Sequence, residues 1–424
     1  MIAAERGTIW RPYTQHGSAD PPLFIEKAEG STLYAKDGRR IFDAISSWWV
    51  NIHGHSHPKI AAAVAEQART LDQVIFASCT HEPAERLADA LVRAAPKGLD
   101  RVFFSDDGST AVEAAVKLAV SFWRRRGEGR RTLIALENAY HGDTFGAMSV
   151  SAPSAFTADY AGMLFDVKRV PWPAPGREKE SLDTLEKLLR SERRRAAAMI
   201  VEPLVMGASG MLMYGAASLK AMREACARHG VLFIADEVMT GFGRTGTLFA
   251  CGQAGISPDI LCLSKGITGG FLPLGATLAM EEVFRAFASE DRSRTFFHGH
   301  SYTGNPLSCA AAVASLSLFE EESTLSRIER IAGIHKRELK RFIRRKEVAD
   351  ARQTGTIAAV ELRVPDAGYL SELGPKLSRF YLSRGVLLRP LGNVVYILPP
   401  YCSTEAELVR AYDAIEESLK IVGL

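Results

Sequence analysis

The chain lacks the features that mark disulfide-rich, membrane-spanning and secreted proteins. Its six cysteines are scattered along 424 residues, and no two of them have C-x-x-C spacing. This pattern argues for reduced thiols in a cytosol, and against a disulfide framework or a structural zinc site. No stretch approaches the roughly 18 apolar residues that a membrane-spanning helix needs. Residues 1–10 carry Glu5 and Arg6 and contain no apolar core, so we expect no signal peptide, no membrane partner and a cytoplasmic location.

The chain also lacks a strong excess of charge of either sign. It has 52 Lys and Arg residues against 49 Asp and Glu residues, which gives a net charge of +3. Proteins that bind nucleic acids usually have a larger basic excess gathered on one surface. The short basic clusters here are Arg124–Arg126, Arg130–Arg131 and Arg193–Arg195. Each follows or ends an apolar-periodic stretch, which favours solvated helix ends, so we expect no nucleic-acid partner.

Short apolar runs alternate with helical patterns through the middle of the chain. The composition, 47% hydrophobic and 24% charged, is that of a globular protein with room for roughly two or three domains. Helical periodicity covers Thr110–Trp123 and Leu219–His229. The predicted strands are Arg101–Ser105, Thr132–Glu137, Ala198–Glu202, Val231–Ala235, Asp259–Leu263 and Leu274–Met280. This alternation predicts an α/β fold with a mostly parallel, buried central sheet.

The pattern differs at the two ends of the chain. Residues 1–50 are irregular and rich in aromatic residues and proline. From about residue 305, a long helical stretch runs through Ala310–Phe319 and past Arg345. Beyond it we predict a loop at 366–376, a final helix over Glu405–Ile421, and short strands at Thr356–Leu362, Val386–Leu388 and Val394–Leu398. We therefore expect an N-terminal segment (1–50), a large domain (51–309) and a smaller C-terminal domain (310–424).

Two residues that can carry chemistry follow predicted strands directly. Sites in open parallel sheets lie at the carboxyl ends of the strands. Asp236 follows Val231–Ala235, and a carboxylate there is either a helix cap, half of a buried salt bridge, or the partner of a protonated ring nitrogen or a metal. Lys265 follows a strand and precedes a glycine-rich turn. It is either a solvated loop lysine or a desolvated amine nucleophile.

Two loops at predicted strand ends are further candidates. The start of the helix after Asp106–Thr110 offers backbone N–H groups and the hydroxyl of Ser109, which suit a phosphate. The alternative is a plain helix cap, with Glu113 completing a capping box. The loop Tyr140–Thr144 places an aromatic ring and an imidazole at the same edge of the sheet, for which core packing is the alternative.

Two motif matches do not fit the functions that they suggest. Gly241–Gly246 matches G-x-G-x-x-G, but it does not follow a strand directly and no clear helix follows it, so we do not expect a dinucleotide site. The alternating histidines His53, His55 and His57 have no neighbouring cysteine or carboxylate in the sequence, and we expect no metal there. A serine-hydrolase elbow, G-x-S-x-G, is absent from the sequence.

Taken together, the motifs resemble those of the class III aminotransferases, which are pyridoxal phosphate enzymes of fold type I. The resemblance rests on Asp236-Glu237-Val238 and Ser264-Lys265-Gly266, and on the motifs at Gly54–Pro58, Asp106–Glu113, Ala139–Thr144, Val201–Pro203, Gly241–Gly246 and Thr303–Leu307. It covers nearly the whole chain. It implies a large domain with a mostly parallel central sheet, and a smaller α+β domain built from the N- and C-terminal segments.

The resemblance also implies roles for individual residues. Lys265 would hold pyridoxal phosphate through its amine and then act as general base and acid. Asp236 would keep the pyridine nitrogen protonated. Tyr140 would stack on the cofactor ring, while Gly108 and Ser109 would bind its phosphate. Ser301 would reach the phosphate in a neighbouring subunit, so the resemblance implies a homodimer with shared active sites.

Three segments resemble one branch of this family, whose members aminate 8-amino-7-oxononanoate in biotin synthesis with adenosylmethionine as the amino donor. They are Trp10–His16, Ser46–Trp49 and Arg389–Tyr401. Arg389 would bind the carboxylate of the keto acid, because a guanidinium offers two parallel hydrogen bonds. The residues implied around the two small-molecule substrates are Tyr13, Trp48, Trp49, Tyr140, Asp143, Gly299 and Tyr396, with Tyr13 in a catalytic position.

Two departures from the family pattern bear on the substrates. Gly207–Gly210 lacks the glutamate that many members have in this loop, which argues against ornithine or γ-aminobutyrate as a substrate. Gly299–Tyr302 reads Gly-His-Ser-Tyr where this branch often has Gly-Pro-Thr-Phe, so lysine is a second possible donor. The sequence also leaves open an ω-amino acid–pyruvate aminotransferase, a nicotinamide oxidoreductase and a non-catalytic binding protein. Arg244 is either a structural arginine or a charge in the site.

Overall fold

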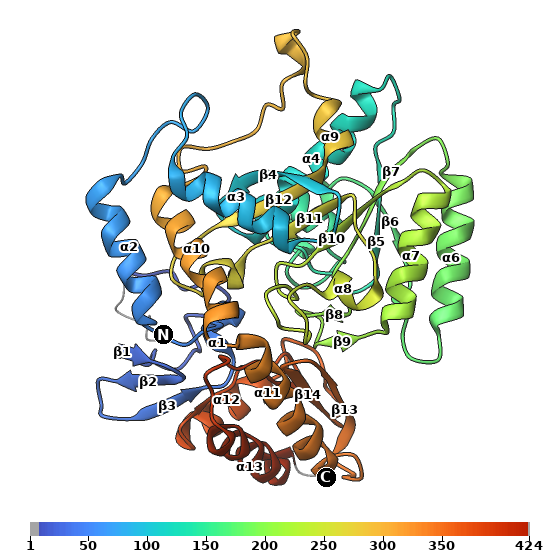
Figure 1. The fold of residues 1–424 in the computed structure, drawn as a ribbon. Coiled ribbons are helices and arrows are strands. Elements are labelled where there is room, and N and C mark those ends of the chain that lie inside the picture. The colour runs from blue at the N-terminus through green and yellow to red at the C-terminus, as the bar shows by residue number, and fades with distance from the viewer. Residues whose placement is uncertain (1–7, 423–424) are drawn as a thin grey trace.

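The computed structural model describes residues 8–422 (Figure 1). The expectation that there is no signal peptide was drawn from residues 1–10, and residues 1–7 of this segment lie outside the described residues. Within residues 8–422, no helix is both long and apolar enough to cross a membrane. The chain forms a large body around one long sheet and a smaller body below it in the view of Figure 1.

A seven-stranded sheet forms the centre of the large body. Its order is β4 (Leu99–Ser105), β12 (Gly275–Met280), β11 (Ile260–Leu263), β10 (Leu232–Asp236), β7 (Ala196–Val201), β5 (Thr132–Leu136) and β6 (Val167–Val170). All neighbours pair in parallel except β12, which runs antiparallel to both β11 and β4. The prediction of a mostly parallel central sheet is therefore confirmed.

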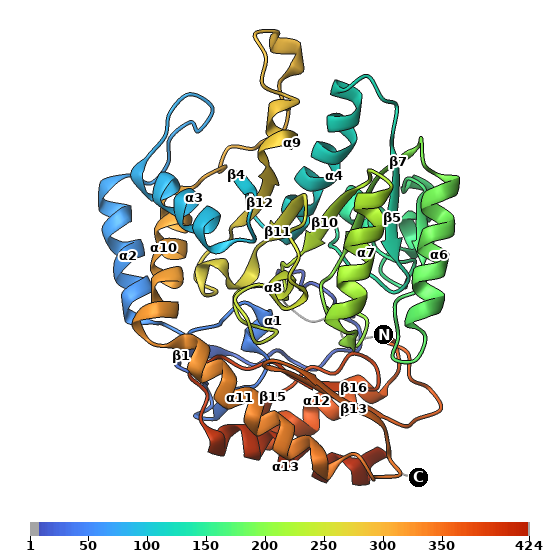
Figure 2. The same ribbon diagram turned by 45° about the vertical axis from the view of Figure 1, so that its right-hand side comes forward.

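The strands are apolar throughout because both faces of the sheet are covered. Alternate residues of β7 point to opposite sides: Met199 and Val201 join one apolar cluster, whereas Ala198 and Ile200 join another. The helices around the sheet are α2 (Pro58–Thr70), α3 (Glu82–Ala94), α4 (Gly108–Arg125), α6 (Glu178–Ser191), α7 (Ala216–Arg228) and α10 (Pro306–Glu321). In Figure 2, α10 packs beside α2 and α3 at one end of the sheet, and α6 packs beside α7 at the other.

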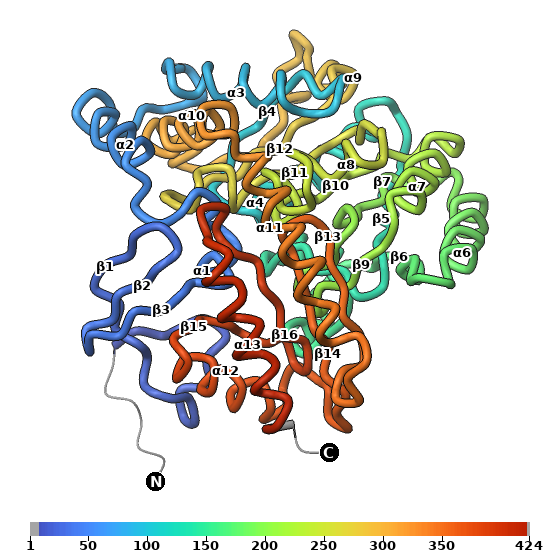
Figure 3. The backbone as a smooth tube through the Cα atoms, turned by 60° about the horizontal axis from the view of Figure 1, so that its bottom comes forward, coloured from blue at the N-terminus to red at the C-terminus, as the bar shows by residue number. Residues whose placement is uncertain are grey.

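The smaller body combines the two ends of the chain. Strands β1 (Ile25–Glu29), β2 (Thr32–Ala35) and β3 (Arg40–Asp43) form a sheet with β15 (Val386–Leu387), which runs parallel to β3. A second sheet consists of β13 (Val348–Thr354), β14 (Ile357–Leu362) and β16 (Val394–Ile397). Helices α11 (Thr324–Glu338), α12 (Leu373–Ser383) and α13 (Glu405–Val422) pack around these sheets, as Figure 3 shows from below.

The remaining elements are short. They are α1 (Ser46–Trp49), α5 (Phe145–Val150), α8 (Ala250–Ala254), α9 (Glu281–Arg285), β8 (Val205–Met206) and β9 (Leu212–Met213).

The structure corrects the expected single helix beyond residue 310. Ser323, with φ of +51°, separates α10 from α11, and α11 ends at Glu338 before a short 3₁₀ turn. The expected boundary at 309/310 falls inside α10. Strands β6 and β13 were not predicted, and neither were β1, β2 and β3, which lie in the segment 1–50 that we expected to be irregular. Helix α12 begins at Leu373, so the loop after β14 is shorter than predicted.

Candidate active site

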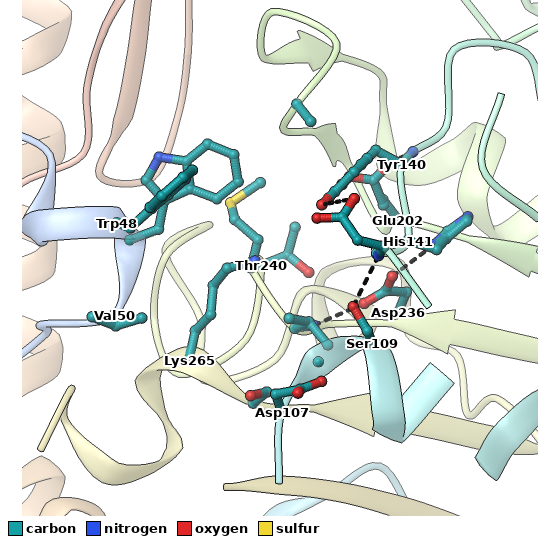
Figure 4. Close-up of a pocket in the computed structure, with 18 of the residues that line it drawn as sticks. Trp48, Val50, Asp107, Ser109, Tyr140, His141, Glu202, Asp236, Thr240 and Lys265 are labelled. Carbon is teal, nitrogen blue, oxygen red and sulfur yellow. Dashed lines mark hydrogen bonds and ion pairs between the residues drawn. The ribbon is translucent and has the colours of Figure 1, made fainter. Parts of the chain in front are cut away.

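One cavity of about 570 Å³ lies between the large sheet and the smaller body (Figure 4). Residues that follow four parallel strands line it: Asp106–Ser109 after β4, Tyr140–Asp143 after β5, Glu202 after β7, and Ser264 and Lys265 after β11. Asp236, the last residue of β10, joins them. The carboxyl ends of parallel strands meet at one edge of a sheet, so residues far apart in sequence reach the same space.

Asp236 is held by the sheet and by an imidazole. Its side chain is only 5% exposed. Its Oδ2 atom lies 2.6 Å from Nδ1 of His141, and its Oδ1 atom accepts a hydrogen bond of 3.1 Å from the backbone N–H of Val238. The other ring nitrogen of His141 is buried without a partner among the described residues. The arrangement fixes a carboxylate with a defined direction at the base of the cavity (Figure 4).

Lys265 enters the cavity from a strained position. Its backbone lies in the left-handed region, with φ of +47°, which is costly for a residue with a side chain. Its Nζ atom lies 5.0 Å from the centre of the Trp49 ring, and within residues 8–422 it makes no hydrogen bond or ion pair. Burial lowers the pKa of Lys265, although the negative charges of Asp236 and Glu202 oppose this shift. The amine is thus closer to its neutral, nucleophilic form than an exposed lysine.

The start of helix α4 forms a cradle for an anion. Asp107 caps the helix by accepting from the backbone N–H of Thr110 at 2.8 Å, and the Thr110 hydroxyl completes the capping box. Glu113, which the helix-cap alternative placed in the capping box, instead accepts hydrogen bonds from two backbone N–H groups at the start of α5. Gly108 and Ser109 therefore remain at the positive helix end that lines the cavity.

Gly142 packs closely against Ser109 at the start of α4. It has φ of +132°, and a Cβ atom added there would lie 2.1 Å from Oγ of Ser109. The Ser109 hydroxyl also accepts a hydrogen bond of 3.1 Å from the backbone N–H of Asp143. Ser109 is therefore positioned by the loop that follows β5.

A cluster of hydroxyl groups and one carboxylate lies on the next wall. The hydroxyl of Tyr140 donates to Asp143 at 3.0 Å, and it lies 3.2 Å from the hydroxyl of Tyr13. The Tyr13 hydroxyl also donates to Asp143. Burial raises the pKa of Tyr13 to about 12, so this group stays protonated at neutral pH.

Arg389 and two tryptophans complete the lining from the smaller body and the N-terminal segment. The Arg389 guanidinium lies 4.5 Å from the centre of the Trp48 ring. The buried indole N–H of Trp49 donates to the hydroxyl of Tyr396 at 3.0 Å. The backbone of Trp49 is left-handed, with φ of +68°, so the residue whose ring faces the Lys265 amine is strained as Lys265 itself is.

Arg244 is a structural residue rather than a free charge in the site. It is 1% exposed and donates to the backbone carbonyls of Pro399 and Trp49 at 2.7 and 3.2 Å. Burial lowers its pKa. It therefore ties the N-terminal segment to the C-terminal domain.

The structure places Gly299 and Ser301 outside this cavity. Both are exposed, and the backbone carbonyl of Ser301 accepts a hydrogen bond from Gln73 at 2.7 Å. Their implied roles concern a neighbouring subunit and remain predictions.

The two motif matches that we set aside have other roles. The segment Gly241–Gly246 is a turn that neither directly follows β10 nor opens a helix, and Gly355 packs on its backbone. The three histidines have different surroundings. Nε2 of His55 lies 2.8 Å from Oδ2 of Asp43, Nε2 of His57 lies 3.0 Å from Oε1 of Glu322, and His53 is buried. Within residues 8–422, no three His, Cys, Asp or Glu side chains are grouped to hold a metal.

Comparison with known proteins agrees with this arrangement, in which the buried amine of Lys265, the carboxylate of Asp236 and the start of α4 line one cavity. A model of the class III aminotransferase family matches residues 13–419. The chain belongs to the class III aminotransferases. It is 47% identical to an adenosylmethionine-8-amino-7-oxononanoate aminotransferase of Synechococcus elongatus, with 97% of this chain and 98% of that protein covered. It is 42% identical to the same kind of enzyme from Geobacter sulfurreducens, with coverage of 99% and 97%.

Solved structures of an aminotransferase and an amine transaminase have the same fold. The adenosylmethionine-8-amino-7-oxononanoate aminotransferase of Methanocaldococcus jannaschii superposes with a TM-score of 0.94 at 37% identity, covering 98% of each chain. An amine transaminase from an uncultivated Pseudomonas species, in its pyridoxal-phosphate-bound form, gives a TM-score of 0.92 at 31% identity, covering 99% of this chain and all of that one. The fold type I architecture is therefore confirmed.

Membership of this aminotransferase family implies pyridoxal phosphate, and the residues of the cavity fit this cofactor. The start of α4 suits a phosphate, because its N–H groups and positive end favour an anion. Asp236 offers a carboxylate whose orientation is fixed by His141. Lys265 offers an amine without a competing partner among the described residues. The three groups line the same cavity, so they could hold the two ends and the reactive carbon of one small molecule.

Some residues of this aminotransferase site were missed by sequence reasoning. His141 was noted only as part of its loop, and Glu202 only as part of a family motif. The Glu202 carboxylate accepts the backbone N–H groups of Tyr140 and Gly207, each at 3.0 Å, and burial raises its pKa to about 7. Phe156 and Tyr369, which also line the cavity, had no signal because each lies in an irregular loop.

Proposed function

We propose that this enzyme converts 8-amino-7-oxononanoate to 7,8-diaminononanoate in biotin synthesis, with S-adenosylmethionine as the amino donor and pyridoxal phosphate as the cofactor. Relatives named for this reaction are 35–47% identical to the chain over nearly its full length. The observation that carries the proposal in the structure is that Lys265 and Arg389 line one cavity with aromatic walls. The substrate has the matching form, with an amino ketone at one end, a carboxylate at the other and an alkyl chain between.

Lys265 performs the proton transfer. Because burial lowers its pKa, the Nζ atom can take a proton from the substrate carbon that carries the transferred amino group and can then act as the general acid that gives a proton back. Asp236 supplies a fixed negative charge that favours a protonated ring nitrogen. Bound in this cavity, pyridoxal phosphate would supply the carbonyl that accepts the amino group and a ring that withdraws electrons.

The remaining site residues bind and orient the substrates. Trp48 and Trp49 provide apolar area for the alkyl chain, and Arg389 provides the charge for the carboxylate. Asp143, which accepts from Tyr13 and Tyr140, gives an acidic contact for a substrate ammonium. The aromatic rings could also face the sulfonium of adenosylmethionine, a contact worth about 0.5–2 kcal/mol.

We further propose a cytoplasmic homodimer. The exposed segment around Gly299 and Ser301 carries Phe297 and Tyr302, which are 73% and 62% exposed. A second copy of the chain would cover these apolar rings and bring Ser301 to the phosphate of its neighbour. All six cysteines are free thiols in the structure, which fits a reducing compartment. Sedimentation of the purified protein tests the dimer.

The test of the reaction is a half-reaction followed by visible spectroscopy. Purified holoenzyme is mixed separately with adenosylmethionine, lysine, ornithine and β-alanine, and loss of the yellow cofactor band reports amino transfer. We expect a response to adenosylmethionine. A response to lysine alone would keep the biotin step and change the donor. A response to only β-alanine or ornithine would contradict the proposed reaction, as would failure to rescue a biotin auxotroph that lacks this step.

Lys265→Ala tests the assignment of the site. The variant should lose turnover and the yellow band of covalently held cofactor, because no other amine among the described cavity-lining residues can replace Nζ. Full activity of this variant would show that the site has been assigned wrongly.

A further inference from the structure

Five side chains that line the active-site cavity contact one another in a closed chain. The ring of Phe156 lies 5.4 Å from that of Tyr13, which lies 5.6 Å from that of Trp48. The Arg389 guanidinium lies over Trp48, and its Nη2 atom donates to the hydroxyl of Tyr369 at 3.2 Å. The ring of Tyr369 then contacts Phe156 edge-to-face, with 4.8 Å between centroids. We call these five residues the collar.

Tyr369, the last member of the collar, lies in a loop whose backbone packs closely on a neighbouring segment. The loop joins β14 to α12, and its backbone lies directly on Gly392. Gly392 has φ of +61°, and a Cβ atom added there would lie 2.4 Å from the carbonyl oxygen of Ala367. Within the loop, the backbone N–H of Ser371 donates a hydrogen bond of 3.0 Å to the carbonyl oxygen of Gly368. The position of Tyr369 is therefore set by the packing of this loop on its neighbours in the C-terminal domain.

The charge in the collar is unbalanced. Within residues 8–422, Arg389 forms no ion pair, and its hydrogen bond goes to the neutral hydroxyl of Tyr369. That hydroxyl accepts from Arg389, and its own proton has no acceptor in the described part of the chain. A cation and a hydroxyl donor thus stand next to each other among aromatic rings, where a single carboxylate would satisfy both.

From this arrangement we infer that Tyr369 is a specificity-determining residue. Its hydroxyl donates the second hydrogen bond to the carboxylate that Arg389 binds, and its ring, held by Phe156, encloses the last carbons of the alkyl chain. The inference rests on the proposed function and extends it. The enzyme would select keto acids with a carboxylate at the end of an apolar chain long enough to pass through the collar.

The test compares the acid substrate with its methyl ester. Enzyme loaded with pyridoxamine phosphate is mixed with 8-amino-7-oxononanoate or with its methyl ester, and the half-reaction gives kcat/KM and KM for each. Tyr369→Phe keeps the ring and removes only the hydroxyl. We expect it to raise the KM for the acid roughly tenfold or more, as expected for loss of a hydrogen bond to a charged group, and to raise the KM for the ester by a smaller factor, because the ester carbonyl is a neutral acceptor.

Two further variants make the outcome decisive. Tyr369→Leu also removes the contact with Phe156, and it should weaken both the acid and the ester. Tyr34→Phe removes a hydroxyl on β2, away from the cavity, and should change neither. An unchanged KM for the acid in Tyr369→Phe, or equal losses for acid and ester, would overturn the inference. Failure of the proposed function would look different, since the wild-type enzyme itself would then not react with the acid.

Discussion

Acid should destabilise this enzyme through the buried imidazole of His53. The ring is 3% exposed, and neither of its nitrogens has a hydrogen-bond partner among the described residues. It packs 5.4 Å from the ring of Phe319. Burial lowers its pKa to about 3, and the neighbouring His57 and Arg327 act in the same direction, while the backbone of Ser315 and the carboxylate of Glu322 oppose them.

The size of the effect follows from proton binding. The unfolded chain takes up a proton at His53 near pH 6.5, whereas the folded protein resists it until about pH 3. The stability that depends on the neutral ring is therefore complete above pH 6.5 and is lost as the pH falls towards 3. Between pH 7.5 and pH 5, this one group should remove about 2 kcal/mol from the free energy of unfolding.

His53→Leu tests this reasoning. Leucine has a similar volume and nothing to protonate, and it replaces a polar group that has no partner among the described residues, so we expect no loss of stability at pH 7.5. Urea titrations at pH 7.5 and pH 5 should show that the free energy of unfolding falls over this range by about 2 kcal/mol less in the variant than in the wild type. The same loss in both proteins would refute the assignment of a neutral, buried ring.

His335 provides the comparison. It is also buried with its pKa lowered to about 4, but its ring nitrogens lie 2.7 Å from the Tyr412 hydroxyl and 3.1 Å from the carbonyl oxygen of Thr356. His335→Leu should therefore weaken the pH dependence in the same way but cost stability at pH 7.5, because it leaves the Tyr412 hydroxyl and the Thr356 carbonyl without these contacts.

Two further variants test the site. Tyr396→Phe leaves the buried indole N–H of Trp49 without its partner, and urea unfolding should show a loss of about 1–3 kcal/mol; equal stability would mean that the indole finds another acceptor. Gly142→Ala would bring a Cβ atom to 2.1 Å from Oγ of Ser109, so cofactor titration should show a dissociation constant raised roughly tenfold or more. The matched control is Gly127→Ala, which also has a positive φ, of +79°, but no atom within 4 Å, and it should bind the cofactor normally.

The sequence by itself determined most strands of the central sheet and the residues at their ends, but strand β6 was not predicted. A strand that is covered on both faces must be apolar along its length, as β7 is, and β10 is apolar up to Asp236. Such an apolar run is a local property that can be read from the sequence. Asp236 and Lys265 could be chosen because each lies at the carboxyl end of such a strand, where the fold class places its sites. The resemblance to class III aminotransferases, later confirmed, assigned these two residues their expected roles.

Only the tertiary structure decided which residues surround those strand ends. The contact of His141 with Asp236 joins residues 95 positions apart, and the one between Arg244 and Pro399 joins residues 155 apart. Tyr369 lies in an irregular loop of the smaller body, where it contacts Arg389, and its contact with Phe156 forms only when the smaller body meets the large one. Local pattern carries no information about such pairs, because their geometry depends on how separately formed elements pack against each other.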